Sequence, residues 1–129
     1  MADTREMVCV RYMVDDVAAA LNFYTTMLGF EVLTHFPPAF ADVARGSLRL
    51  LLSGPASSAG RAMPDGTKPG PGGWNRIHLL VDDIEAEVAR LKSAGATFRN
   101  EVLSGPGGKQ VLLLDPAGNV IELFQPAGR

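Results

Sequence analysis

The stretch NRIHLLVDDIEAEVARLKSAGA, residues 75–96, decides the fold because an earlier stretch, VCVRYMVDDVAAALNFYTTMLGF at residues 8–30, has the same plan. In both, a strand-like run of alternating residues leads to VDD, then to a helix-like run, and then to a glycine. The two VDD motifs begin at residues 14 and 81, which are 67 apart, and Gly29 and Gly95 are 66 apart. This nearly constant offset indicates a tandem duplication.

Each half is predicted to form one β-α-β-β-β unit. Asp15 or Asp16 is predicted to cap the first helix, and Asp82 or Asp83 the second. A carboxylate oxygen at this position can accept hydrogen bonds from the free N–H groups of the first helical turn. The first strands are expected at residues 8–14 and 74–81, and the later ones at 30–36, 39–45, 47–53, 97–103, 109–115 and 119–125. The fold class is therefore α+β, with two tandem modules whose curved mixed sheets form a cleft.

The predicted organisation is one domain over residues 1–129. Module 1 covers about 7–53, a linker covers 54–73, and module 2 covers about 74–126. The linker has six glycines and four prolines among twenty residues, so it has little to bury. A passive connection and a lid over a site are both compatible with this composition.

Composition limits the class of partner. The chain is 47% hydrophobic and 20% charged, as in an ordinary soluble domain, and its net charge is −2. No basic cluster is present, so neither nucleic acid nor an anionic membrane is expected as a partner. No apolar run reaches the length of a membrane span, and the single cysteine, Cys9, excludes an internal disulfide. A cytoplasmic protein is expected.

Strand alternation divides the first strand of each half into two faces. One face is apolar and is expected to pack under the helix; its members are Val10, Tyr12, Ile77 and Leu79. The other face carries Cys9 and Arg11 in the first half, and Arg76 and His78 in the second. These polar faces are predicted to line the cleft, where a small molecule would bind.

Three stretches together resemble the glyoxalase / bleomycin-resistance / extradiol-dioxygenase superfamily, also called vicinal oxygen chelate proteins. They are VDDVAAALNFYTTMLGF, RIHLLVDDIEAEVARLKSAGA and LLLDPAGNVIELFQP, and the resemblance covers about residues 8–126. It implies the duplicated fold, a small-molecule ligand in the cleft, and a homodimer that completes the cleft. The physical reason for a second chain is that small curved sheets leave apolar edges that need cover.

The resemblance also implies where metal ligands would stand. Metal enzymes of this superfamily take one ligand from the first and one from the last strand of each unit. The corresponding positions here hold Cys9, Arg76 and Glu122, with Leu50 or Leu51 as the fourth. Only Glu122 is a plausible hard ligand, since leucine cannot bind a metal and a guanidinium repels one. No metal and no other cofactor is therefore expected.

The predicted ligand-binding residues each have an alternative role. Arg76 is expected to pair with Glu122 across the cleft or to hold an anionic ligand. Trp74 stacks on a flat ligand or packs at an interface, and His78 is a base or a groove residue without chemistry. Cys9 is also explained as a small buried apolar residue. The full set is Cys9, Arg11, Trp74, Arg76, His78 and Glu122.

Two further features are expected to have no role in binding. His35 stands beside FPP, where a surface or turn position is expected. GPGGKQ at residues 105–110 is glycine-rich, but Gln110 stands where a phosphate-binding loop needs Ser or Thr, so a hairpin or a strand-entry loop is predicted.

Three functions remain open. The first is a metal-independent binding protein of bleomycin-resistance type that sequesters an antibiotic-like ligand, with antibiotic resistance as its consequence. The second is a metal-dependent lyase, isomerase or dioxygenase of the same superfamily that uses Glu122 in an unusual ligand set. The third is a cofactorless enzyme with His78 as base and Arg76 as the group that holds an anion.

Overall fold

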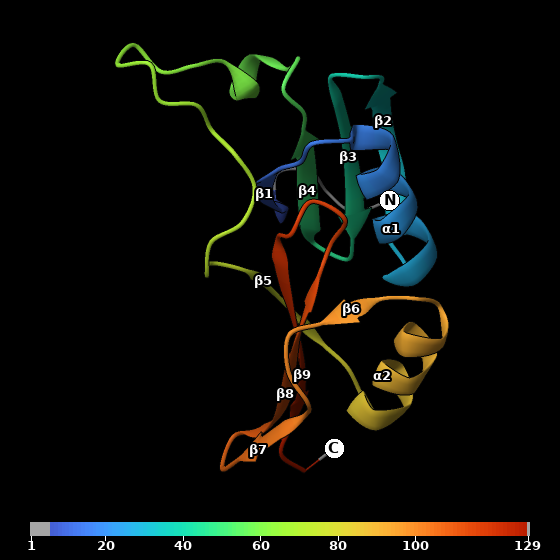
Figure 1. The fold of residues 1–129 in the computed structure, drawn as a ribbon. Coiled ribbons are helices and arrows are strands. Elements are labelled where there is room, and N and C mark those ends of the chain that lie inside the picture. The colour runs from blue at the N-terminus through green and yellow to red at the C-terminus, as the bar shows by residue number, and fades with distance from the viewer. Residues whose placement is uncertain (1–5, 129) are drawn as a thin grey trace. The chain divides into compact units, whose positions relative to one another are not determined.

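The computed structural model describes residues 6–128 (Figure 1). They divide into two compact units, the first ending at Gly72 and the second beginning at Gly73. Each unit has one α-helix and one mixed sheet, of four strands in the first and five in the second. The α+β class and the duplicated plan are therefore confirmed. The single domain around a shared cleft stays a prediction.

The first unit follows the predicted order β-α-β-β-β. Its sheet has the order β1-β4-β3-β2, with β1 parallel to β4 and the other pairs antiparallel. The elements are β1 (Val8–Met13), α1 (Val17–Met27), β2 (Glu31–Phe36), β3 (Phe40–Arg45) and β4 (Leu48–Ser53). This topology places the first strand beside the last, so residues far apart in sequence become neighbours on one face.

The second unit repeats the topology with one extra strand. Its sheet has the order β5-β9-β8-β6, and β7 also pairs with β8. The elements are β5 (Ile77–Leu80), α2 (Ile84–Ser93), β6 (Thr97–Phe98), β7 (Leu103–Gly105), β8 (Gly108–Leu114) and β9 (Val120–Pro126). Strands β5 and β9 are parallel, as β1 and β4 are in the first unit.

Two predicted strands differ from the structure. The strand expected at 74–81 spans only Ile77–Leu80, and the one expected at 97–103 is interrupted between Phe98 and Leu103. In the gap, the backbone N–H of Leu112 donates to the side-chain oxygen of Asn100 (3.1 Å) instead of to a backbone carbonyl. The side chain thus replaces one bond of the ladder, and regular pairing stops there.

Both helices begin and end where the repeated motif predicts. Asp16 caps α1 by accepting from the N–H of Ala19, and Asp83 caps α2 by accepting from that of Ala86, each at 3.1 Å. The second aspartate of each VDD is therefore the cap, which decides between the two candidates. Gly29 and Gly95 follow the helices with φ of 72° and 93°, conformations that favour glycine.

The helices cover the apolar face of each sheet. In the first unit, Tyr24 of α1 is fully buried and packs edge-to-face on Phe23 and Phe30, with ring centroids 5.0 and 5.5 Å away. In the second unit, Ile84 and Leu91 of α2 are fully buried. As predicted, Tyr12, Ile77 and Leu79 are buried, whereas Val10 is only partly so.

The glycine- and proline-rich segment falls in the first unit and begins with an ordered turn. The Ser57 hydroxyl donates to the carbonyl of Gly54 (2.6 Å) and accepts from the N–H of Gly60 (3.2 Å), and a short 3₁₀ helix, η2, spans Ser58–Gly60. A Cβ at Gly60 would lie 2.5 Å from the Gly54 carbonyl oxygen, so only glycine fits. For the segment 54–73 as a whole, the roles of linker and of lid both stay predictions.

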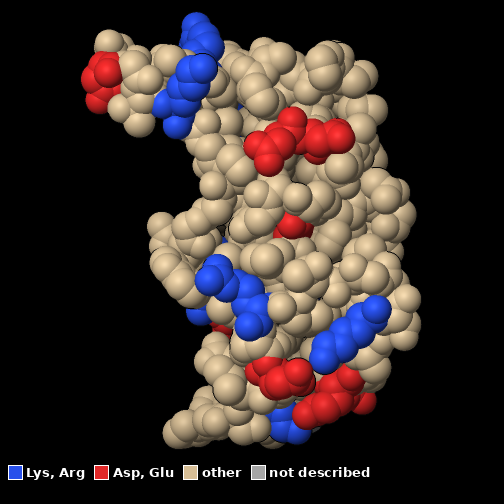
Figure 2. Space-filling model, in the orientation of Figure 1, with Lys and Arg blue, Asp and Glu red and all other residues tan. Residues whose placement is uncertain are grey.

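Among residues 6–128, no helix is long and apolar enough to cross a membrane. Figure 2 shows acidic and basic side chains interspersed on the face in view rather than gathered into one patch of a single sign.

Replacing Asp16 with alanine tests the cap of α1. Loss of the carboxylate leaves a helical N–H without its acceptor, so the free energy of unfolding should fall by about 1 kcal/mol. The exposed neighbour Asp15 is the matched control, and Asp15→Ala should change stability by less than about 0.5 kcal/mol. Urea denaturation followed by circular dichroism measures both; equal losses would mean that Asp15 shares the cap.

Candidate functional site

The candidate site lies on the face of the second sheet that points away from α2, called here the open face. Strand alternation places Ile77 and Leu79 of β5 towards the helix and leaves His78 and Leu80 exposed. In the parallel register, His78 stands beside Glu122 of β9. Glu122 in turn stands beside Leu112 of β8. The open face therefore presents one buried carboxylate in the middle of the sheet.

Glu122 is held by two cationic or protonatable side chains. Its side chain is only 8% exposed. Its Oε1 accepts from Arg76 Nε at 3.0 Å and lies 2.9 Å from Arg76 Nη2, while its Oε2 lies 3.3 Å from His78 Nε2. A buried carboxylate needs partners of this kind because leaving it without them is costly. Both of its oxygens are thus engaged by the chain itself.

Arg76 stands just before β5. Besides Glu122, it donates from Nη1 to the backbone carbonyl of Trp74 at 3.3 Å, and its side chain is 30% exposed. The predicted Arg76–Glu122 ion pair is therefore confirmed. It does not cross a cleft, however: both residues belong to the second unit, where the parallel pairing of β5 with β9 brings Glu122 next to the start of β5.

His78 is the more accessible of the two partners of Glu122. Its side chain is 46% exposed, and its ring packs at a tilt against Phe124 with centroids 4.9 Å apart. The imidazole therefore has one nitrogen directed at a carboxylate while much of the ring remains open to a ligand. This arrangement suits either a groove residue or a base.

A cavity of about 460 Å³ opens beside Arg76 on the same unit. Trp74 stands at its wall with 63% of its surface exposed, and the guanidinium carbon of Arg99 lies 4.2 Å from the centre of the indole ring. This is a cation–π contact. The lining residues are Trp74, Arg76, Arg99, Asn100, Leu103, Gln110 and Leu112.

Five of these lining residues were missed by the sequence reasoning. Gln110 and Leu112 share the face of Glu122 in β8, so alternation along that strand would have found them. Arg99, Asn100 and Leu103 lie at or next to the break between β6 and β7, which no sequence pattern had indicated. Reading 97–103 as one continuous strand hid their grouping.

The corresponding face of the first sheet carries the other two predicted residues. Cys9 is exposed, so its explanation as a buried apolar residue is wrong. Arg11 donates to the Ser53 hydroxyl at 2.8 Å. The structure brings together Trp74, Arg76, His78 and Glu122 within the second unit. That Cys9 and Arg11 join them stays a prediction.

The first sheet has a buried charged pair of its own, which the sequence analysis did not predict. Asp42 of β3 is almost fully buried, and it accepts from the Arg49 Nε at 2.5 Å and from the backbone N–H of Thr34 at 2.9 Å. The hydrogen bond to Asp42 raises the pKa of Arg49 above its usual value. His35 is exposed on the edge strand β2, as the surface prediction required.

The register decides which residue of the first unit corresponds to Glu122. His78 pairs with Glu122, and Arg11, 67 residues before His78, pairs with Leu51. Leu51 rather than Leu50 is therefore the equivalent position. Within residues 6–128 no group of three or more His, Cys, Asp or Glu side chains is placed to hold a metal ion. The donors present do not fit the metal that the fold family implies.

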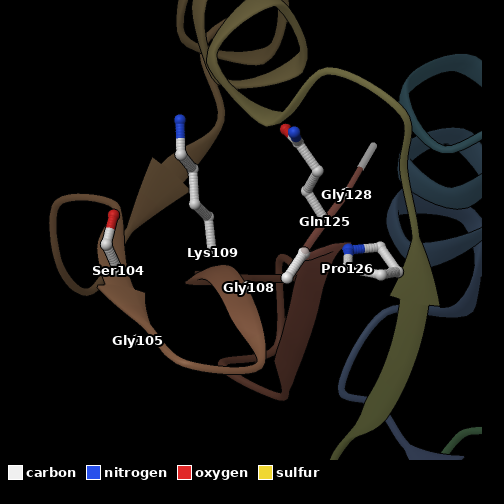
Figure 3. Close-up of a pocket in the computed structure, with 8 residues that line it drawn as sticks. Ser104, Gly105, Gly108, Lys109, Gln125, Pro126 and Gly128 are labelled. Carbon is white, nitrogen blue, oxygen red and sulfur yellow. The ribbon is translucent and has the colours of Figure 1, made fainter.

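The glycine-rich stretch near residue 105 forms a hairpin, as predicted. Gly105 of β7 pairs with Gly108 of β8. Figure 3 shows the side chains of Lys109 and Gln125 extending in the same direction beside this hairpin. Lys109 Nζ lies 3.1 Å from the Glu85 carboxylate, and the Gln125 side-chain oxygen accepts from the N–H of Ile84 at 2.9 Å. These polar groups attach α2 to its sheet.

The sequence of residues 7–123 matches the family model of the Glyoxalase/Bleomycin resistance protein/Dioxygenase superfamily. The chain belongs to this superfamily. Proteins of the superfamily bind small molecules, and the two helices and two mixed sheets described above are consistent with the α+β glyoxalase fold.

Three relatives show how near the similarity comes. The putative glyoxylase CFP32 of Mycobacterium bovis is 30% identical over 128 residues, which are 97% of this chain but 46% of that protein. The chain thus spans about half the length of this curated relative. The antibiotic binding protein TnmS3 from Streptomyces sp. CB03234 is 29% identical with a TM-score of 0.72, covering 94% of this chain and 95% of that one. A superfamily member from Sphaerobacter thermophilus is 26% identical with a TM-score of 0.75, covering 97% and 98%.

Replacing Arg76 with methionine tests the ion pair. Removing one partner leaves Glu122 buried with His78 alone, so the free energy of unfolding should fall by about 2–3 kcal/mol, less than for a fully buried pair because Arg76 is partly exposed. Adding Glu122→Gln to Arg76→Met should recover part of that loss, because no stranded charge remains.

The surface pair of Arg90 and Glu87, 2.8 Å apart, is the control. Arg90→Met should cost at most about 1 kcal/mol. Chemical denaturation of Arg76→Met, of Glu122→Gln and of the double variant gives the coupling free energy between Arg76 and Glu122. Additive losses would show that the pair contributes nothing as a unit.

Proposed function

We propose that this chain is a metal-independent small-molecule binding protein whose ligand lies on the open face of the second sheet. The observation that carries the proposal is the engagement of both Glu122 oxygens by Arg76 and His78. A metal ion would therefore have to compete with Arg76 and His78 for the oxygens of Glu122. The neighbouring cavity of about 460 Å³ has the size of a ligand pocket.

The charge of Arg76 gives the physical reason for metal independence. The side chain stands where the resemblance places a metal ligand, and it brings a permanent positive charge against the one acidic candidate. A divalent ion would have to displace this guanidinium from Glu122 and then tolerate it nearby. Within the described residues, nothing supplies the three or four donors that would offset those costs.

The relatives support an antibiotic-like ligand. TnmS3, which is described as antibiotic binding, is similar over almost the whole of both chains. The proposal therefore extends to sequestration of a drug-like molecule, with resistance as its consequence. It includes a cytoplasmic homodimer, with Cys9 and Arg11 joining the ligand cleft. Exposed Val32, Leu33 and Phe36 on the edge strand β2 support a second chain, since such an edge needs cover.

Metal analysis tests this proposal. Protein purified without chelator should carry no stoichiometric zinc, iron, nickel or manganese by mass spectrometry, and added metal should not raise its melting temperature. A metal present at about a hundred times its dissociation constant would add about 2.7 kcal/mol of stability, which a thermal melt detects readily.

The variant Arg76→His is the contrast, because it removes the guanidinium and supplies an imidazole at the family's ligand position. If added metal raised the melting temperature of this variant but not that of the wild type, Arg76 would be the reason that metal does not stabilise the wild type. One tightly bound metal per wild-type chain would overturn the proposal.

A second candidate is a cofactorless enzyme with His78 as base. The observation that favours it is the 3.3 Å approach of His78 Nε2 to Glu122 Oε2, since a carboxylate can orient an imidazole. The binding proposal expects that a molecule co-purifying with the protein stays chemically unchanged during incubation.

Mass spectrometry of the incubated complex decides between the two candidates. Conversion by the wild type, together with binding but no conversion by His78→Gln, would establish the enzyme. An unchanged molecule in both would support the binding protein.

A further inference from the structure

Among residues 73–128 of the second unit, one cation has no ion-pair partner among the carboxylates of those same residues. These residues include five lysines and arginines. Four are paired with carboxylates: Arg76 with Glu122 at 2.9 Å, Arg90 with Glu87 at 2.8 Å, Lys92 with Glu101 at 3.6 Å, and Lys109 with Glu85 at 3.1 Å. Among these described residues, no carboxylate lies within ion-pair distance of the fifth, Arg99.

Arg99 is exposed, and two contacts hold it at the wall of the cavity. Its backbone N–H donates to the Leu112 carbonyl at 2.9 Å, which attaches it to β8. Its guanidinium lies 4.2 Å from the centre of the Trp74 ring. Stacking on an indole leaves the N–H groups at the rim of the guanidinium available, because the contact uses only its flat face.

The rest of the cavity wall is largely apolar. Leu103, which is exposed, and Leu112 contribute aliphatic surface, and Trp74 contributes the indole. Gln110 adds a neutral amide. This wall offers apolar surface beside a charged donor, and a hydrogen bond from a guanidinium to an anion is stronger than one between neutral groups.

We propose that the ligand of this cavity is a small monoanionic carboxylate with an apolar or aromatic body, and that Arg99 recognises its carboxylate. This inference rests on the proposed binding function and names its ligand class. One unpaired positive charge is neutralised by one negative charge, whereas a doubly charged phosphate would leave an excess. The planar fork of the guanidinium matches the two oxygens of a carboxylate. The body of the ligand lies on Leu103, Leu112 and Trp74.

Trp74 is the only tryptophan of the chain, so its fluorescence reports on this cavity directly. The probes are 4-phenylbutyrate and its neutral amide, 4-phenylbutanamide, which have nearly the same shape. Binding is measured by Trp74 fluorescence and by calorimetry in EDTA. The wild type should bind the carboxylate at least about ten times more tightly than the amide, because a charge-assisted hydrogen bond replaces a neutral one.

The variant Arg99→Gln should lower that preference to less than about twofold while leaving binding of the amide nearly unchanged. Arg90→Gln makes the same change in net charge on the exposed side of α2 and should keep the preference. Arg99→Lys retains the charge without the planar fork and should keep part of it. Melting temperatures confirm that each variant is folded, and if Arg99→Gln is not, the comparison rests on Arg99→Lys.

Three results would overturn the inference: equal binding of the two probes, a preference that survives Arg99→Gln, or no binding of either probe to the wild type. Failure of the proposed function gives a different pattern, since binding would then require added zinc. Binding of the amide and the carboxylate with equal affinity in EDTA would reject the ligand class and leave metal-independent binding in place.

Discussion

Burial of the Glu122 carboxylate on a sheet face that no helix covers is the constraint on which the rest of the site depends. One helix protects one side of each sheet, so side chains of the other side must satisfy one another or find a ligand. Glu122 stands in the middle of its sheet between β5 and β8, where an unpaired charge would be costly. His78 in the neighbouring strand β5 and Arg76 just before that strand meet this requirement. The parallel pairing of β5 with β9, which follows from the β-α-β-β-β order, is what brings them within reach.

The first unit solves the same problem with different residues. Its buried carboxylate is Asp42, held by Arg49. The registers make Leu51 the equivalent of Glu122 and Asp42 the equivalent of Leu112, because each of these pairs stands side by side in its own sheet. The duplicated halves therefore share the pattern of one arginine and one buried acid, but not its positions. A pair of this kind fixes neighbouring strands in register without any ion from solution.

Much of the fold could be predicted because it depends on local and periodic signals. The VDD motif fixes a strand end and a helix cap, and glycines with positive φ end both helices. The Arg76–Glu122 pair could also be predicted, since the family resemblance places both residues at ligand positions, although the pair was expected to cross a cleft. The cavity beside it could not. It depends on the break at Asn100, where a single side chain replaces one backbone bond of the ladder. Nothing in TFRNEVL distinguishes this arrangement from a continuous strand, and Arg99 and Leu103 lie on either side of it.

The two arginines of the cavity differ because of what each one contacts. Arg76 has a fixed counter-charge in Glu122, so its guanidinium adds little net potential and serves to hold the sheet together. Arg99 has an aromatic ring instead of a carboxylate as its partner, which orients the guanidinium without neutralising it. A metal site would concentrate positive charge at Glu122 itself. Here the carboxylate is already neutralised, and the unbalanced charge lies further along the sheet, beside Trp74 and Leu112. Under the proposed binding function, ligand selectivity would depend on the wall of the cavity rather than on the centre of the sheet.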